Sequence, residues 1–228
     1  MKLHNDTMPF LQELMQNNNR EWFLSNKSRW DDIRRDFLAF TQAAIDEVVK
    51  FDPTIGHPDP TRAMYRIYRD VRFSPDKRPY KTHVSFFLPT GGVRRTGMPG
   101  YYIQLDADPT EGCFMGGGIF MPEPEALNAI RQEIFYNIED FQAILSSKNF
   151  QQWFPDGLWD FGKLKTAPKG YPKDWPHIDL LKYKHYTMTH PFDASLATSP
   201  DLLGYVLDCF RATLPLNQFV QKAMYELI

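Results

Sequence analysis

The chain has 228 residues, of which 43% are hydrophobic and 24% charged, proportions typical of a globular protein. A chain of this size buries enough surface on folding to need no disulfide scaffold. Its two cysteines, Cys113 and Cys209, form no C-x-x-C pair, which excludes a cysteine-based zinc site. We expect no disulfide, no metal and no cofactor, in a monomeric or weakly associated protein.

The sequence pattern predicts neither a membrane segment nor an export signal. No stretch approaches the roughly 18 uninterrupted apolar residues of a membrane span, and residues 1–10 lack the apolar run of a signal peptide. We therefore expect a cytoplasmic protein that has no membrane partner.

The net charge of −2 conceals an asymmetry. Residues 62–95 carry nine basic and two acidic side chains, a net charge of +7, which leaves −9 for the rest of the chain. Such a distribution indicates a localised positive surface on a mildly acidic body. It favours an anionic ligand over extended contact with nucleic acid, although an ordinary solvated charge run fits equally well.

Residues 7–50 have a helical pattern. Apolar residues recur every three or four positions from Trp30 to Val48, which predicts an amphipathic helix. Asn17 to Asn19 interrupt the pattern, because asparagine tolerates the backbone conformations that end helices.

Between residues 62 and 120 the hydrophobic period changes to two, which predicts strands near 63–73, 82–88, 101–106 and 113–120. Short connections between successive strands favour an antiparallel meander over βαβ units.

The remainder of the chain is predicted to be mainly helical. We expect a helix over residues 122–150, an irregular segment at 155–182, a further strand at 186–192 and C-terminal helices over 199–228, where Pro200 suits a first turn. The predicted fold class is α+β in a single domain over residues 1–228. An antiparallel sheet occupies the middle of the chain, and the N- and C-terminal helices pack mainly on one of its faces.

The most informative segment is residues 66–81, which reads Arg-Ile-Tyr-Arg-Asp-Val-Arg-Phe-Ser-Pro-Asp-Lys-Arg-Pro-Tyr-Lys. Together with Asn18–Phe23, Gly116–Gly118 and Ile130–Arg131, its Arg-x-x-Arg-Asp-x-Arg-Phe…Asp-Lys-x-x-Tyr motif resembles domain of unknown function 2461, a family of bacterial and fungal proteins. The resemblance covers roughly residues 10–214 and implies no established activity.

If residues 65–73 form a strand, Arg66, Asp70 and Arg72 share one face. Arg69 then falls on the apolar face, where a guanidinium is costly unless it is paired, so we expect it at a sheet end or beside a carboxylate. The prolines of residues 74–79 predict a stiff turn. Lys77 or Tyr80 should then lie close to the three polar residues, in a concave region of positive potential.

The other motifs in the sequence are less specific indicators of function. Gly116–Gly118 lacks the lysine and hydroxyl residue of a phosphate-binding loop, so we interpret it as close backbone packing or the floor of a cleft. The six histidines form no pair with metal-ligand spacing.

Three hypotheses remain open. The leading one is a binding module for a small phosphate- or carboxylate-bearing ligand, since arginine forks bind such oxyanions in bidentate fashion. Its candidate ligand-binding residues are Arg66, Arg69, Arg72, Lys77, Tyr80 and Lys81. The second is an enzyme acting on a phosphorylated substrate, with Asp70 or Asp76 as general base. In the third, the Arg/Asp network is structural and function runs through a protein partner; nucleic acid is a less favoured partner.

Overall fold

A four-stranded antiparallel sheet lies at the centre of the computed structural model, which describes residues 1–91 and 97–225. The strands are β1 (His83–Pro89), β2 (Gly100–Asp106), β3 (Phe114–Ile119) and β4 (Tyr186–Pro191), and they pair in that order. Apolar residues at alternate positions fix the register, because a slip of one residue would turn them away from the helices. Phe86, for example, lies opposite Ile103, and both are fully buried.

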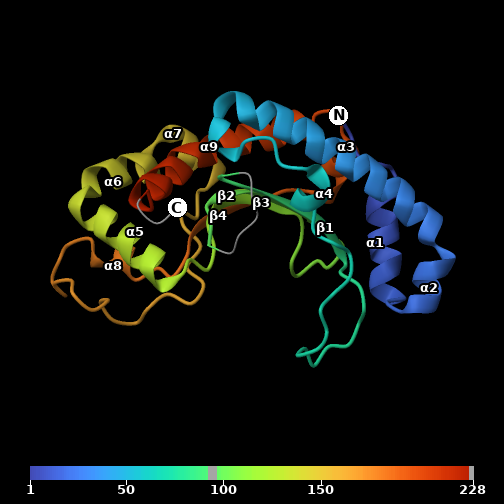
Figure 1. Ribbon diagram of the computed structural model, residues 1–228, viewed down its shortest axis with the longest axis horizontal. Coiled ribbons are helices and arrows are strands. Elements are labelled where there is room, and N and C mark those ends of the chain that lie inside the picture. Colours follow the sequence, from blue (N-terminus) through green and yellow to red (C-terminus); the bar gives the residue numbers. More distant parts are fainter. Residues whose placement is uncertain (92–96, 226–228) are drawn as a thin grey trace.

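The helices arch over one face of the sheet and down both of its sides (Figure 1). In chain order they are α1 (Thr7–Gln16), α2 (Arg20–Ser25), α3 (Lys27–Phe51), α4 (Pro60–Ala63), α5 (Pro124–Tyr136), α6 (Ile138–Ser146), α7 (Lys148–Trp153), α8 (Ile178–Leu181) and α9 (Leu202–Ala223), with short 3-10 helices η1 (Pro53–Ile55) and η2 (Ala194–Thr198). The two long helices α3 and α9 cover the sheet, whereas α1 and α2 lie at one end and α5 to α8 at the other.

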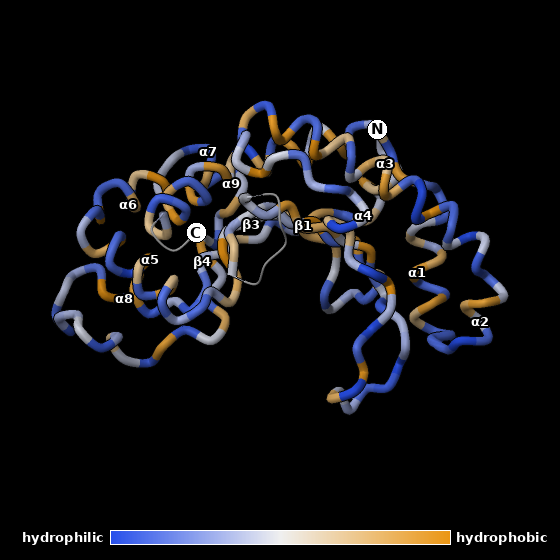
Figure 2. The backbone as a smooth tube through the Cα atoms, in the orientation of Figure 1, coloured by the Kyte–Doolittle hydropathy of each residue, from blue (hydrophilic) through white to orange (hydrophobic). Residues whose placement is uncertain are grey.

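The buried apolar side chains of these elements form one core cluster. Figure 2 shows hydrophobic residues along the strands and on the long helices, while the loop of residues 66–81 that hangs beside α1 and α2 is mainly hydrophilic. The α+β class is confirmed, as is the mid-chain antiparallel sheet covered by N- and C-terminal helices.

The strand predicted at 63–73 is wrong. Only two isolated bridges occur there, Met64 with Phe86 and Tyr68 with Tyr80. The two prolines of the segment, Pro75 and Pro79, have no N–H and cannot donate to a β-ladder. The polar side chains of the segment bond one another instead, so an alternating sequence forms an irregular loop.

Two helical predictions also need correction. The helix predicted over 122–150 is three helices, α5, α6 and α7, separated at Asn137 and at Ser147, whose hydroxyl caps α7 by accepting from the Phe150 N–H. The two helices predicted over 199–228 form one in the described residues, α9, which continues through Pro215 and ends at Ala223, and residues 226–228 lie outside the described part. Within the irregular segment 155–182 lies the short helix α8.

Candidate functional site

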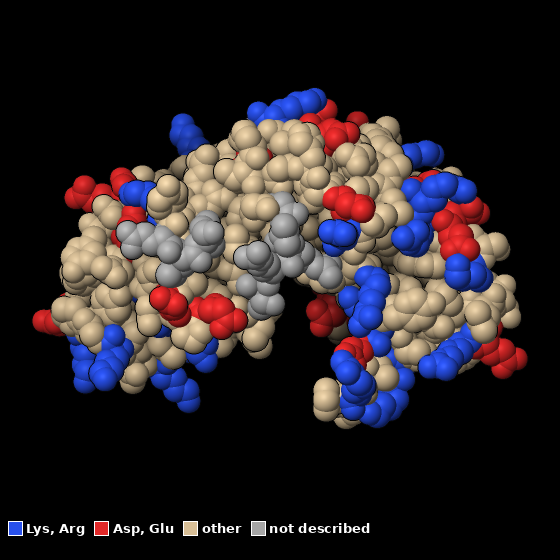
Figure 3. Space-filling view, in the orientation of Figure 1, with Lys and Arg blue, Asp and Glu red and all other residues tan. Residues whose placement is uncertain are grey.

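The face of the sheet opposite α3 and α9 is the floor of a cleft of about 620 Å³. Side chains on this face alternate with those buried under the helices. The cleft-facing residues are His83, Ser85 and Phe87 of β1, Tyr102 of β2, Phe114, Gly116 and Gly118 of β3, and Thr187 and Thr189 of β4. Figure 3 shows the molecule hollowed below the sheet, with lysine and arginine side chains gathered on residues 66–81 at one wall.

Glycines form the middle of the floor. A Cβ on Gly116 or Gly118 would lie 2.1 Å from a carbonyl oxygen of β4, that of Met188 or Tyr186, and both glycines have positive φ (156° and 100°). Only glycine fits so close to the neighbouring strand in this conformation. Close backbone packing and the floor of a cleft are the two alternative interpretations of this triplet, and the structure shows both.

A buried carboxylate organises the polar end of the cleft. Asp106 Oδ1 accepts hydrogen bonds from Thr82 Oγ1 (2.8 Å) and the Asp108 N–H (2.9 Å), and Oδ2 lies 3.1 Å from His83 Nδ1 and 3.2 Å from Gln104 Nε2. Burial opposes ionisation of Asp106, but the bonds from His83, Asp108 and Thr82 outweigh it and lower its pKa. The group is therefore a carboxylate near neutral pH.

The ionised state of Asp106 determines how His83 is held. A carboxylate can only accept hydrogen bonds, so His83 Nδ1 carries a proton and donates it. The His83 side chain is 23% exposed and lines the cleft, whereas that of Asp106 is 3% exposed. Among the described residues, none makes a hydrogen bond to His83 Nε2. In the neutral ring this nitrogen is a proton acceptor.

Two hydroxyl groups in the cleft bond to none of the residues that the structure describes. Thr187 Oγ1 and Ser85 Oγ are buried and have no hydrogen-bond partner within the described part of the chain. Ser85 lies beside the Tyr102 phenol, whose pKa burial raises to about 12, but without a hydrogen bond of good geometry to it. The Tyr102 hydroxyl donates to Gln104 Oε1 instead (2.7 Å). Unpaired buried polar groups are costly and point to a missing partner such as a ligand or water.

Aromatic side chains form the wall opposite residues 66–81. The rings of Phe120 and His185 are 4.7 Å apart, and Trp159 stacks on Phe161 at 5.1 Å. Trp159 is 42% exposed and Phe120 47%. His185 Nδ1 accepts from the backbone N–H of Met121, a cleft-lining residue with a left-handed backbone (φ 49°). The cleft thus has an aromatic wall on one side. The basic segment, residues 66–81, lies on the other side and contributes Lys81 to the lining.

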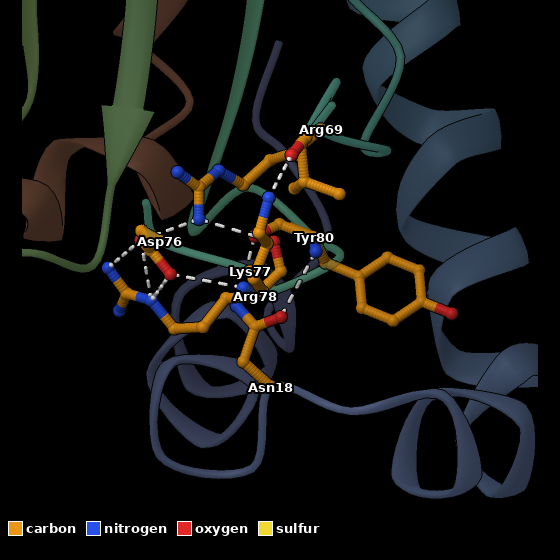
Figure 4. Close-up of polar contacts among 7 residues, drawn as sticks. Asn18, Arg69, Asp76, Lys77, Arg78 and Tyr80 are labelled. Atoms are coloured by element: carbon orange, nitrogen blue, oxygen red, sulfur yellow. Dashed lines mark hydrogen bonds and ion pairs between the residues drawn. The ribbon is translucent and has the colours of Figure 1, made fainter. Parts of the chain in front are cut away.

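The basic segment is held together by its own ion pairs. Asp76 Oδ2 receives Arg69 Nη1 at 2.6 Å and Arg78 Nη2 at 2.8 Å, so two guanidiniums converge on one carboxylate (Figure 4). Lys77 Nζ donates to the carbonyl of Val71 (2.9 Å). The expectation that Arg69 meets a carboxylate is confirmed, with Asp76 as the partner.

The same segment is tied to the N-terminal helices through Asn18. The Asn18 side chain accepts from the Tyr80 N–H and donates to the Tyr80 carbonyl, both at 3.0 Å (Figure 4). The Tyr80 ring is buried and stacks on Phe23 with centroids 4.1 Å apart. Tyr80 therefore anchors the loop, and its ring belongs to the core.

The two candidate general bases of this segment are both paired. Arg72 donates to Asp70 from its side chain and backbone, and these bonds lower the Asp70 pKa to about 2. Hydrogen bonds from Arg78 and Arg69 likewise hold the Asp76 pKa below its usual range. Carboxylates of such low basicity are poor proton acceptors at neutral pH.

The predicted site residues do not converge as expected. Arg66, Asp70 and Arg72 lie on an exposed loop rather than on one strand face. Of the predicted site residues, Lys81 alone lines the cleft, and its Nζ lies 4.9 Å from the centre of the Tyr65 ring. Sequence reasoning missed His83 and Asp106, which are unremarkable in isolation and become neighbours only through the β1–β2 register.

The described residues contain neither a group of metal ligands nor a membrane-spanning helix. Over residues 1–91 and 97–225, no three histidine, cysteine or acidic side chains are grouped as metal ligands. Within the same ranges no helix is both long and apolar enough to cross a bilayer.

The fold and the cleft define an α+β protein with a ligand-sized cavity on the open face of an antiparallel sheet. The chain belongs to the family described as Conserved hypothetical protein (DUF2461), whose model matches residues 6–219. No curated protein and no solved structure matches the chain.

Proposed function

We propose that the protein binds a small organic molecule carrying a carboxylate or phosphate group in the cleft on the open sheet face. The observation that carries the proposal is a cavity of about 620 Å³ whose lining includes two buried hydroxyls, those of Ser85 and Thr187, that bond to none of the described residues. Ligand sites combine apolar walls with a few converging polar groups in this way.

The lining matches the two halves of such a ligand. Aromatic and methionine side chains supply apolar contact area: Tyr65, Phe87, Met98, Tyr102, Phe114, Phe120, Met121 and Trp159. Lys81 is a cation of the lining at the polar end, near His83. A ring or short apolar chain fits the first set, and an anionic group fits the second.

This proposal keeps the class of ligand predicted for residues 66–81 and moves its binding site. Arg69, Arg72 and Arg78 are engaged by Asp70 and Asp76, and none of the segment's arginines, Arg66 included, is part of the cleft lining. We therefore assign them to the wall beside the cleft. Lys81, at the end of the segment, is the residue that we assign to the ligand.

Calorimetric titration with benzoate and phenyl phosphate tests the proposal, with inorganic phosphate as the ring-free comparison. A charge-assisted contact contributes roughly 1.5–3 kcal/mol, so Lys81→Met should weaken binding by about one to two orders of magnitude. Thr187→Val, which removes a cleft hydroxyl while keeping its shape, should also weaken it.

Arg72→Ala is the matched control, because Arg72 is 76% exposed and outside the cleft lining. It should leave both affinities unchanged. If neither benzoate nor phenyl phosphate binds, the proposal is contradicted. Binding that is lost in Arg72→Ala and kept in Lys81→Met would return the ligand to the basic segment.

A further inference from the structure

The cleft contains an acid–base pair that binding alone does not require. His83 donates from Nδ1 to Asp106, and its ring lines the cavity with Nε2 unbonded to any described residue. A histidine oriented by a buried carboxylate, with its second nitrogen directed to substrate, is the arrangement that general-base catalysis needs. We propose that the cleft is a hydrolytic site for carboxylic esters, with His83 as general base and Asp106 as its positioning residue.

Asp106 is built to hold the ring in one orientation. Its four hydrogen bonds come from Thr82 before β1, His83 of β1, Gln104 of β2 and the Asp108 backbone in the following turn. The carboxylate therefore cannot rotate without losing several bonds, and it is nearly inaccessible to solvent. A fixed acceptor opposite Nδ1 keeps the proton of the neutral ring on that atom and leaves Nε2 without one.

The hydrolytic step uses only water and the ester. His83 Nε2 takes a proton from a water molecule as the water oxygen bonds to the acyl carbon, and the carbonyl becomes an oxyanion. When the oxyanion collapses, the ester C–O bond breaks and the proton passes from Nε2 to the leaving oxygen. The products are a carboxylic acid and an alcohol, and His83 returns to its neutral form.

Neighbouring groups favour an ester as the substrate. Ser85 lies two residues beyond His83 on the same strand face, so its unpartnered hydroxyl is on the side where the oxyanion forms. Since no described hydrogen bond joins Ser85 to His83, the nucleophile that we assign is water. The mainly apolar lining suits a neutral ester, and Lys81 complements the charge of the acid product.

The test is the release of p-nitrophenol from p-nitrophenyl acetate and butyrate by the full chain. General-base catalysis contributes about 10²–10⁴-fold, so His83→Gln should lower the rate by at least about 100-fold. His57→Gln, which removes an exposed histidine outside the cleft, should leave the rate unchanged. Equal rates for wild type and His83→Gln, or no rate above buffer in wild type, would overturn the inference.

The Asp106→Asn variant tests whether Asp106 acts by orienting the His83 ring or only by stabilising the fold. The variant should lower the rate, and ¹⁵N NMR of the His83 ring should show the proton no longer confined to Nδ1. An unchanged tautomer with an unchanged rate would contradict the role of Asp106. If His83→Gln does not fold, carbethoxylation of wild-type His83, mapped by mass spectrometry, must abolish hydrolysis in proportion to modification; activity that survives overturns the assignment.

This inference rests on the proposed function in using the same cleft, but the two fail separately. Benzoate that binds to wild type without any esterase activity leaves the binding proposal intact and rejects catalysis. Esterase activity that benzoate inhibits, and that Lys81→Met makes less sensitive to benzoate, supports both. Esterase activity that depends on His83, in a protein that binds neither benzoate nor phenyl phosphate, supports catalysis and rejects the anionic ligand.

Discussion

Asn217 of α9 bonds the sheet directly at Gly118. Its side-chain Oδ1 accepts from the Gly118 N–H at 3.1 Å, and its Nδ2 donates to the Gly100 carbonyl, also at 3.1 Å. Both glycines lie where β2 and β3 pair, and the conformation of Gly118 (φ 100°) departs from that of a regular strand. One fully buried amide thus satisfies two backbone groups, the N–H of Gly118 in β3 and the carbonyl of Gly100 in β2.

Asn217→Ala should therefore destabilise the fold although it removes only a small side chain. It leaves a buried donor and a buried acceptor unpaired, at roughly 1–3 kcal/mol for each. Urea denaturation would measure the loss. Gln218→Ala, one position along on the exposed side of α9, should change stability by under about 0.5 kcal/mol. Similar losses in the two variants would contradict this role for Asn217.

Alanine substitutions at Gly118 in the cleft floor and at Gly204 in α9 should have opposite effects on stability. Gly118→Ala puts a Cβ 2.1 Å from the Tyr186 carbonyl oxygen in a conformation that L-residues avoid, so the loss should exceed the roughly 1–3 kcal/mol of backbone strain alone. Gly204, inside α9, has open space where a side chain would begin, with no neighbouring atom within 4 Å of the position that a Cβ would take. Gly204→Ala should gain up to roughly 1 kcal/mol from helix propensity. Thermal melts of both variants check the contrast, and a tolerated Gly118→Ala would disprove it.

The parts of the fold that follow from local pattern could be predicted from the sequence. The strands ending at Pro89, Asp106 and Ile119 show a period of two, and the spacing from Trp30 to Val48 marks the core face of α3. These patterns depend only on residues that are close in the sequence, so they can be recognised without knowledge of tertiary contacts.

The cleft could not be predicted in the same way. His83 and Asp106 are 23 positions apart, and they meet because the β1–β2 register sets them opposite each other. A register shifted by one residue would place the two side chains on different faces. Which face of the sheet stays uncovered depends on where α3 and α9 pack, and no single segment encodes that.

The basic segment, residues 66–81, contains a local pattern typical of turns. The period-two spacing of its apolar residues led us to predict a strand there instead. Asp70 and Asp76 each accept from the backbone N–H two residues later and pair with the side chain of the same arginine, Arg72 or Arg78. An aspartate that bonds the backbone two residues on is a turn former. The repeated Asp-x-Arg therefore indicates two Asx-type turns, which compete with a strand.

Acid should weaken the fold in part through Asp106. Its pKa in the folded protein lies below the unfolded value of about 3.9, so its stabilising contribution is fully present above that value and is lost as pH falls through the lowered folded pKa. Asp106→Asn should thus be less stable than wild type near pH 7, with the difference narrowing toward pH 2. Urea midpoints measured from pH 7 to pH 2 test this. Parallel pH curves for the two proteins would contradict it.

Arg69 should rigidify the basic segment, residues 66–81, whereas Arg72 should not. Arg69 is 25% exposed and joins Asp76 to the Arg78 carbonyl across the loop, while the Arg72–Asp70 pair is exposed on both sides and spans only two residues. Arg69→Ala should speed amide hydrogen exchange throughout residues 70–79, because the loop loses its cross-link while Asn18 still holds Tyr80. Arg72→Ala should speed exchange only near residues 70–72 and leave the melting temperature unchanged, as expected for a solvent-screened pair. Hydrogen–deuterium exchange followed by mass spectrometry resolves the two patterns. Equal exchange across the loop in both variants would mean that its order comes from the prolines and Asn18 rather than from Arg69.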